Sequence, residues 1–258
     1  MIRALYSSAT GMKAQEMLID VTANNLANVN TNGFKRSQLD FADLLYTRPK
    51  QAGAPVDGLT SPIGIEIGSG VRPVGTTKSF TPGTFEQTGI ATDVAIEGDG
   101  FLQVTVNGET RYTRDGALRQ GPDGALMTGD GYLLADGITI PASGRSVTIS
   151  PAGEVSYMEN GTVTTAGQIT LANFPNPAGL NSEGSNLFSA TDAAGPPQPG
   201  IPGQDGLGTI RGQFLERSNV EVVTELISLI TAQRAYEINS RAIRAGDEML
   251  STTTDIVR

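Results

Sequence analysis

The sequence predicts an α+β protein in which an antiparallel β sandwich or barrel-like domain is carried on paired N- and C-terminal α-helices joined by an extended β arm. Three observations lead to this expectation. Apolar residues recur every seventh position at both ends of the chain, as in helices that pack on other helices. All 14 prolines, which interrupt helices, lie between Pro49 and Pro202. The middle of the chain holds short apolar runs between Asp-Gly and Asn-Gly dipeptides, which favour β-hairpins.

The first predicted helix runs from Met1 to about residue 28. Its seven-residue apolar row is Leu5, Met12, Ile19 and Leu26. An Asn-rich stretch follows, and Asn and Gly tolerate left-handed backbone conformations. We therefore expect the helix to end near Asn28 and the chain to turn at Asn32-Gly33.

The middle of the chain divides by composition. Residues 44–77 combine many Pro and Gly residues with short alternating pieces, which predicts an extended linking arm. Residues 78–211 predict an all-β outer domain. The remaining segments, 1–43 and 212–258, are expected to form one discontinuous helical assembly domain.

The last predicted helix runs from about Ser218 to Val257 and is roughly 60 Å long at 1.5 Å per residue. Ser218 or Asn219 is expected to cap it, and Glu225 suits the positive end of the helix dipole. Its apolar row is Val222, Leu229, Tyr236, Ile243 and Leu250. Such a helix either packs on its own domain or completes its burial against other chains. Head-to-tail contacts of the second kind generate an open helical assembly.

Composition excludes several classes of function. A net charge of −9 argues against binding to nucleic acid or an anionic membrane surface. The chain contains no His and no Cys, which removes Ser-His-Asp and thiol catalysis and the usual zinc sites. No catalytic residue, cofactor or metal is expected. The polar N-terminus does not resemble a cleaved signal peptide, so the residues alone indicate the cytoplasm.

The acidic residues support a remote alternative function. The protein would then be a soluble glycan-binding protein or a carboxylate-dependent glycan hydrolase. Most of the candidates precede Gly, where a turn already explains them. The candidates for general acid and base work are Asp93, Glu97, Asp99, Asp115 and Asp130. The candidates for a calcium site are Asp99, Asp115, Asp123 and Asp130. A loose basic cluster, Lys35, Arg36, Arg48 and Lys50, is interpreted as solvated surface.

Two strings resemble the signatures of the bacterial flagellar rod, hook and hook-associated proteins. One runs from Ala23 to Arg36 and the other from Leu229 to Arg241. Internal landmarks such as Phe80-Thr-Pro-Gly83 are most similar to those of distal rod subunits, and the likeness is weakest over residues 157–206. The signature positions are Asn24, Asn25, Leu26, Ala27, Asn28, Asn30, Thr31, Gly33, Phe34, Gln233, Arg234, Ala235 and Tyr236.

The resemblance implies a non-enzymatic structural subunit of the basal-body rod. Such subunits are exported unfolded by the flagellar type III apparatus and assemble through their terminal helices into a hollow shaft that crosses the periplasm and transmits torque to the hook. This replaces the cytoplasmic expectation. The implied partners are further copies of the chain, other rod proteins, the hook, the surrounding ring proteins and the export apparatus, with no nucleic acid and no membrane insertion.

The resemblance also bears on a short motif, Phe41-x-x-x-Leu45, which is similar to one read by the export gate. The alternative is an ordinary amphipathic turn. At the level of the whole chain, a proximal rod or hook subunit of the same axial family is the alternative to a distal rod subunit.

Overall fold

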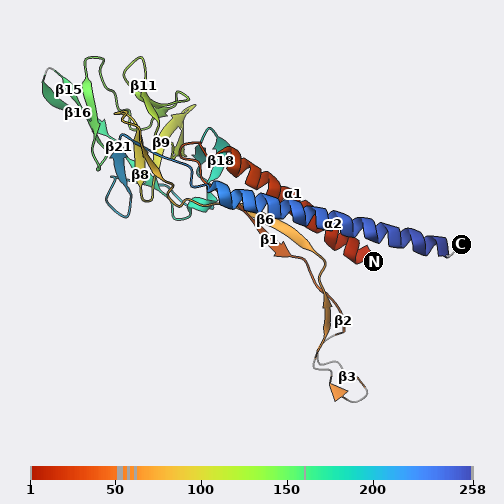
Figure 1. Cartoon of the computed structure of the whole chain (residues 1–258). Coiled ribbons are helices and arrows are strands. Elements are labelled where there is room, and N and C mark those ends of the chain that lie inside the picture. Colours follow the sequence, from red (N-terminus) through yellow and green to blue (C-terminus); the bar gives the residue numbers. More distant parts are fainter. Residues whose placement is uncertain (1, 51–54, 57–58, 61–62, 160, 257–258) are drawn as a thin grey trace. The chain divides into compact units, whose positions relative to one another are not determined.

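The computed structural model describes residues 2–50, 55–56, 59–60, 63–159 and 161–256 (Figure 1). The chain forms two compact units. The helical unit consists of Met1–Leu26, Ser37–Thr77 and Glu221–Arg258, and the β unit consists of Ala27–Arg36 and Lys78–Val220. The chain therefore passes between the units four times. The sequence analysis divided the chain into three domains, with boundaries at residues 44, 78 and 212. That these three domains fold separately stays a prediction.

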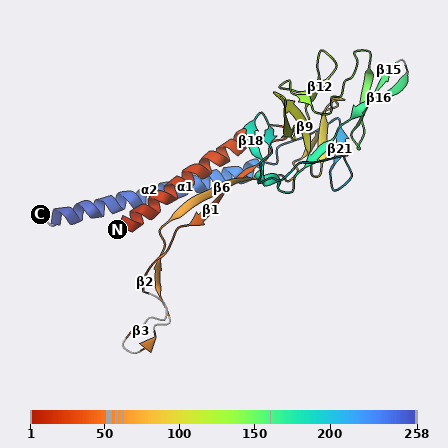
Figure 2. The same cartoon turned by 180° about the vertical axis from the view of Figure 1, so that it is seen from behind.

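Two long helices dominate the helical unit, α1 (Ile2–Ala27) and α2 (Val222–Ile256). They run side by side in opposite directions, with the start of α1 and the end of α2 at the same end of the pair (Figures 1 and 2). Both helices were predicted, and Met1 and Val257 at their predicted ends lie outside the described residues. The predicted capping role was wrong for Asn219, because its side chain binds backbone groups of residues 36, 79 and 81 instead.

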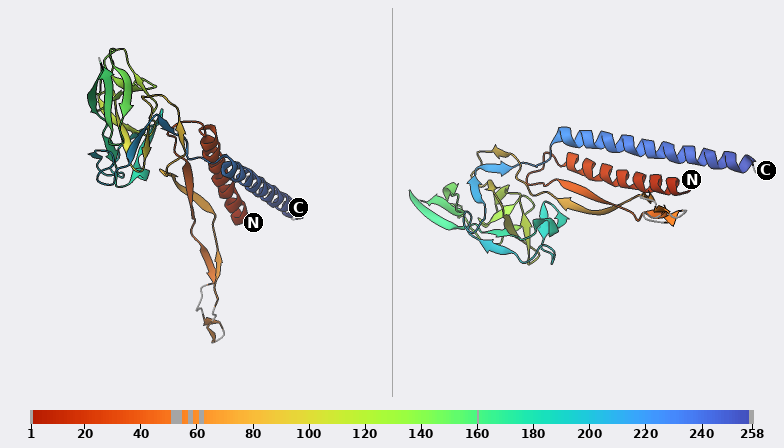
Figure 3. Two further views of the ribbon diagram at one scale, coloured as in Figure 1. Left: turned by 60° about the vertical axis from the view of Figure 1, so that its left-hand side comes forward. Right: turned by 90° about the horizontal axis from the view of Figure 1, so that it is seen from below.

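The helical unit also contains a two-stranded ribbon made of nested strand pairs (Figure 3). In each pair the later strand returns beside the earlier one, so that the segment predicted as an extended arm is a long hairpin. The pairs are β1 (Ser37–Asp43) with β6 (Val71–Lys78), β2 (Thr47–Lys50) with β5 (Ile65–Ile67), and β3 (Pro55–Val56) with β4 (Leu59–Thr60).

The largest sheet of the β unit has nine strands in the order β11-β12-β13-β9-β10-β19-β18, with β17 beside β9 and β20 beside β17. Every pairing in it is antiparallel. Its strands are β9 (Phe101–Val106), β10 (Glu109–Thr113), β11 (Leu118–Gln120), β12 (Leu126–Thr128), β13 (Leu133–Leu134), β17 (Leu171–Asn173), β18 (Asn181–Gly184), β19 (Leu187–Ser189) and β20 (Gln198–Gly200).

Smaller antiparallel groups complete the β unit. They are the sheet of β14 (Arg145–Ile149), β15 (Glu154–Glu159) and β16 (Thr162–Gln168), the pair of β8 (Val94–Glu97) and β21 (Thr209–Gly212), and the pair of β7 (Phe85–Gln87) and β22 (Phe214–Glu216). A short 3₁₀ helix covers Pro177–Gly179. The α+β prediction is confirmed, whereas the described strands do not close into a barrel.

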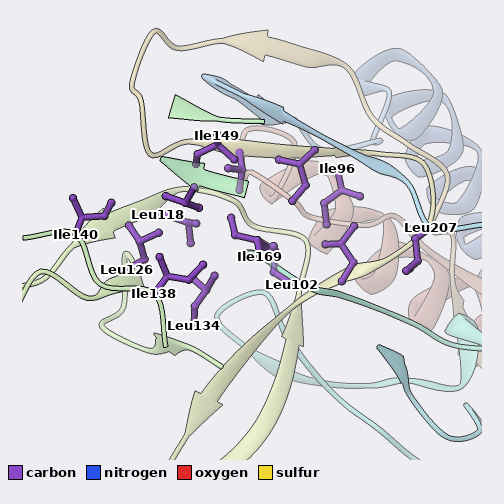
Figure 4. Packing of buried hydrophobic residues seen from close by; sticks show 14 residues of the cluster. Ile96, Leu102, Leu118, Leu126, Leu134, Ile138, Ile140, Ile149, Ile169 and Leu207 are labelled. Atoms are coloured by element: carbon purple, nitrogen blue, oxygen red, sulfur yellow. The ribbon is translucent and has the colours of Figure 1, made fainter. Parts of the chain in front are cut away.

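The β unit is held by an aliphatic core drawn from several of these sheets (Figure 4). Leu102, Leu118, Ile140 and Ile169 are among its members that are fully buried. A second cluster is aromatic, and in it Tyr112 packs edge-on against Phe174 with ring centroids 4.7 Å apart. The predicted turn dipeptides place these strands, since Asn107 and Gly108 both have positive φ where β9 returns as β10.

Candidate assembly surface and its polar anchors

Three contacts fix the register of α1 against α2. A Cβ built on Gly246 would lie 2.5 Å from Leu5 Cδ2, and one on Gly11 would lie 3.0 Å from Asn239 Nδ2. The third contact joins Asn25 to Glu225. In an antiparallel helix pair, residues that face each other have a constant sum of residue numbers as long as the register does not change. The three pairs sum to 251, 250 and 250, so one register holds along the helices. Glycine at two of the three contacts lets the helices approach closely.

The seam of α2 that faces α1 is therefore made of small and polar residues. Glu225, Ala232, Asn239 and Gly246 recur every seventh position, and Ala232 and Glu225 are almost completely buried. Ala14 of α1 is buried as well. This seam differs from the predicted apolar row, which begins at Val222. Ala232 and Gly246 were not predicted to lie in this seam, because they add little to an apolar repeat.

The predicted row lies beside this seam. Val222 and Tyr236 are exposed. The remaining members are half-buried, namely Leu5, Met12, Ile19, Leu26, Leu229, Ile243 and Leu250. Pairing within one chain thus leaves part of the surface of this row open to solvent.

A larger apolar surface lies on the first turns of α2. We name it the outer patch, and it consists of Val222, Val223, Leu226, Ile227 and Ile230, all of them exposed. Ile227 is 60% exposed and Val223 is 63% exposed. A helix that is apolar on more than the face it buries is typically covered by a further partner.

Asn25 anchors the ribbon to the helix pair. Its Nδ2 donates to the Ser37 carbonyl (2.8 Å), and its Oδ1 accepts from the Ser37 backbone N–H (2.9 Å), so one side chain pairs with the start of β1. The same Nδ2 lies 3.2 Å from Glu225 Oε2. A single buried amide therefore connects α1, α2 and the ribbon, which explains one position of the Asn-rich signature.

A second anchor, which we call the ionic anchor, lies in the β unit and consists of Lys35, Glu216 and Arg114. Lys35 Nζ lies 2.6 Å from Glu216 Oε1 with both side chains fully buried, and it also donates to the Thr81 carbonyl (2.9 Å). The Gly83 N–H donates to the same carboxylate oxygen (3.0 Å). The solvated-surface interpretation of the basic cluster was wrong for Lys35, whereas the Arg48 side chain is indeed exposed.

Arg114 completes this ionic anchor. Its Nη1 lies 3.7 Å from Glu216 Oε2, and its guanidinium stacks over the Phe101 ring at 5.2 Å. Among the described residues, Arg114 Nε and Nη1 and Glu216 Oε2 have no hydrogen-bond partner. Burial lowers the pKa of both Lys35 and Arg114 below their ordinary values, and the Glu216 charge opposes that shift in each. The Glu216 carboxylate thus lies beside both buried cations, and the Asp99 charge also acts on Arg114.

The signature turn is locked against the ionic anchor. Gly33 donates its N–H to the Glu216 carbonyl (2.8 Å) with φ of +68°, and the Asn32 carbonyl accepts from Asn186 Nδ2 (3.0 Å). The Arg36 N–H donates to Asn219 Oδ1 (2.7 Å). The sequence predicted the turn, but it gave no signal that Glu216 and Arg114 would meet it from distant strands.

Gly33→Ala should destabilise the β unit by about 2–4 kcal/mol. A Cβ at this position would lie 2.6 Å from the Arg114 carbonyl carbon and the Asp115 nitrogen, which are backbone atoms, in addition to the cost of positive φ. Gly108→Ala is the matched control, since Gly108 also has positive φ but has open space around it. It should cost about 1 kcal/mol. Equal losses in urea unfolding would contradict this account.

The other signature residues divide into two groups. Thr31 and Asn28 bond to each other through their side chains (3.1 Å), and Lys78 lies over the Phe34 ring at 5.3 Å. These contacts are structural. By contrast, two of the remaining signature residues are half-buried, Leu26 and Ala235. The others are exposed, namely Asn24, Ala27, Asn30, Gln233, Arg234 and Tyr236. The C-terminal signature thus lies mainly on exposed α2 surface.

The short Phe41-x-x-x-Leu45 motif lies at the end of β1 and in the break before β2. Phe41 is 39% exposed and Leu45 is 90% exposed, so neither supports the core of the unit. This exposure leaves both side chains accessible to another protein.

Three of the acidic residues considered for catalysis make local structural contacts. Asp93 accepts from Thr88 Oγ1 and Arg119, Glu97 pairs with Arg211, and Asp115 accepts from the Ala117 N–H. Burial raises the pKa of Asp115 above its ordinary value. Within the described residues, no three His, Cys, Asp or Glu side chains gather to hold a metal ion. Neither α1 nor α2 has an apolar stretch that could cross a membrane.

Comparison with known sequences gives matches at both ends and in the middle. Residues 5–35 match the model described as flagella basal body rod protein, residues 95–157 match the flagellar hook protein FlgE/F/G D1 domain, and residues 211–256 match the flagellar basal body rod FlgEFG protein C-terminal model. The chain is 42% identical to the flagellar basal-body rod protein FlgG of Borreliella burgdorferi, covering 100% of both chains.

The chain belongs to the flagellar basal-body rod protein family. Other proteins with the same description are 43% identical in Agrobacterium fabrum, over 97% of both chains, and 38% identical in Bacillus subtilis, over 100% of both. The resemblance drawn from the two terminal signatures is confirmed. As a rod protein the chain is a component of the flagellar basal body, where it assembles with other rod and hook components.

Proposed function

We propose that this rod protein is a non-enzymatic structural subunit of the distal rod, which polymerises into a hollow drive shaft that transmits torque from motor to hook. The observation that carries the proposal is the outer patch. After α1 and α2 have paired, five large apolar side chains at the start of α2 still face solvent. Burial of such a surface between copies supplies the driving force for assembly.

The buried anchors suit a subunit that transmits torque. Asn25 ties the ribbon to both helices, and the Lys35–Glu216 pair ties the signature turn to β22. Buried polar networks with few alternative partners define one arrangement of the segments that they join. A subunit that transmits torque needs such a single fixed arrangement of its segments within each unit.

We further propose that the chain is exported unfolded through the type III apparatus, with Phe41 and Leu45 as the segment that the export gate reads. Its partners in the assembled state are further copies, other rod proteins, the hook and the surrounding ring proteins. The predicted packing rows, Leu5 to Leu26 in α1 and Val222 to Leu250 in α2, then contact neighbouring helices together with the outer patch.

The test uses a strain that lacks this gene. Its basal bodies should stop before the hook, and the wild-type chain should restore the rod and hook in electron micrographs. Phe41→Ala should abolish secretion while the purified variant keeps the wild-type circular dichroism spectrum, since Phe41 is not in a core. Tyr6→Ala, an exposed aromatic residue outside the motif, is the control and should be secreted. Complete rods and hooks without the gene would refute the proposed function.

A further inference from the structure

The two-stranded ribbon of the helical unit is interrupted along its length. β1 pairs with β6 and ends at Asp43, whereas β2 pairs with β5 and begins at Thr47. Between these pairs lie residues 44–46 on one side of the ribbon and residues 68–70 on the other, and none of these described residues belongs to a strand. We name this interruption the break, the pair β1 and β6 the ribbon base, and the pair β2 and β5 the distal ribbon.

The ribbon base is fixed to α1. Asn25 of α1 bonds both backbone groups of Ser37, at the start of β1. At the end of the base that borders the break, the Val71 N–H donates to Thr10 Oγ1 (3.4 Å). Gly70 lies so close to α1 that a Cβ built on it would overlap the Thr10 side chain. Contacts at both ends therefore hold the ribbon base against the helix.

The distal ribbon buries little of its surface. All of its residues except Lys50 are exposed, so side chains on both of its faces lie in solvent. The Arg48–Glu66 ion pair (2.7 Å) joins its two strands to each other. A segment with few buried contacts moves at little cost in free energy. The direction of the distal ribbon therefore depends mainly on the backbone of the break.

The break combines flexible backbone with one side-chain restraint. Gly68 and Gly70 lack the Cβ that restricts the backbone of other residues. On the opposite side the Tyr46 ring packs on Gly68, where an added Cβ would lie 3.5 Å from Tyr46 Cε1. The Tyr46 hydroxyl also hydrogen-bonds the Asp43 carboxylate, which raises the pKa of Tyr46 above its ordinary value. Tyr46 thus links the last residue of β1 to the far side of the break.

We propose that the break is a hinge about which the distal ribbon swings relative to the ribbon base, and that Tyr46 limits the swing. Protein hinges are a few residues between rigid segments that absorb the change in backbone angles, and they often include small residues. An open hollow of about 450 Å³ borders the break, so packed side chains do not oppose a change of direction there. The hinge is a property of one subunit, and it goes beyond the proposed function without depending on polymerisation.

Distances between spin labels measure the swing, because the natural chain contains no Cys that would take up label. The distal pair is Lys13→Cys with Ile65→Cys, and the base pair is Lys13→Cys with Val74→Cys, all at exposed positions. Pulsed electron paramagnetic resonance of labelled chain in an excess of unlabelled chain gives the distribution of distances within one subunit. The distribution of the distal pair should be at least about twice as wide as that of the base pair. Equal widths would overturn the hinge.

Two substitutions should change the width of the distal distribution in opposite directions. Gly68→Ala should narrow it, because Gly68 does not have a positive φ and the added methyl group fits beside the Tyr46 ring while it restricts the backbone. Tyr46→Ala should broaden it, because the restraint across the break is lost. Gly75→Ala is the matched control for the first change, since it places a methyl group in open space within the ribbon base, and it should leave the width unchanged.

Far-ultraviolet circular dichroism checks that each labelled variant keeps its helices. The hinge is refuted if Gly68→Ala leaves the distal distribution as wide as in wild type, or if Gly75→Ala narrows it equally. A distribution in Tyr46→Ala that is no wider than in wild type would overturn the restraining role of Tyr46. None of these results bears on the proposed function, which the electron micrographs of basal bodies test separately.

Discussion

Glu216→Gln should lower the free energy of unfolding of the β unit by about 3–5 kcal/mol. The substitution preserves the size of the side chain but removes the one negative charge that contacts both Lys35 and Arg114, which are buried. Lys35 would then lose its ion-pair partner while buried, and Arg114 would keep only the Asp99 charge nearby. Urea unfolding followed by near-ultraviolet circular dichroism measures the loss.

The control for this prediction is Glu86→Gln. Glu86 pairs with Arg217 at a similar distance, 2.5 Å, but both side chains are about half exposed. Water and salt screen such a pair, so the unfolding midpoint should change little. The account of the ionic anchor fails if Glu216→Gln is as mild as Glu86→Gln.

The double substitution Ile227→Asp with Ile230→Asp should abolish assembly of the purified protein at concentrations at which wild type forms polymers. Each residue would lose about 1.5–3 kcal/mol of apolar burial between copies and would introduce a charge into the contact. The expected result is at least a hundredfold higher critical concentration. Sedimentation velocity measures it, and far-ultraviolet circular dichroism checks that the helices persist.

The matched control carries the same charges on the β unit. Met158→Asp with Val163→Asp replaces two exposed apolar residues of β15 and β16, which belong to no helix. This variant should assemble like wild type. If both double variants lose assembly equally, added negative charge rather than the outer patch explains the effect.

Much of the architecture could be predicted because the signals are periodic or local. Seven-residue apolar repeats, the confinement of Pro to the middle and the Asn-Gly turns each depend on neighbours within a few positions. They located both helices to within a few residues and identified the β segments. Local spacing also places the Glu237–Arg241 ion pair, since its residues are one helical turn apart and lie 3.4 Å from each other.

The anchors could not be predicted, since they join residues that are far apart in the chain. Lys35 and Glu216 are separated by 181 positions, and Asn25 and Glu225 by 200. Before the fold is known, a lysine after an Asn-rich turn is expected to be solvated, because burial of an unpaired charge is costly. The seam of α2 was missed for a related reason, since Gly246 and Ala232 carry almost no hydrophobic signal although they decide how closely the helices approach.

The central claim is that the paired helices leave an apolar surface that other copies cover. A cryo-electron-microscopy reconstruction of the polymer formed by the full chain tests it most directly. We expect a hollow tube in which Val223, Ile227 and Ile230 are buried against helices of neighbouring copies. A polymer held together by contacts between β units, with these three side chains still in solvent, would contradict the account.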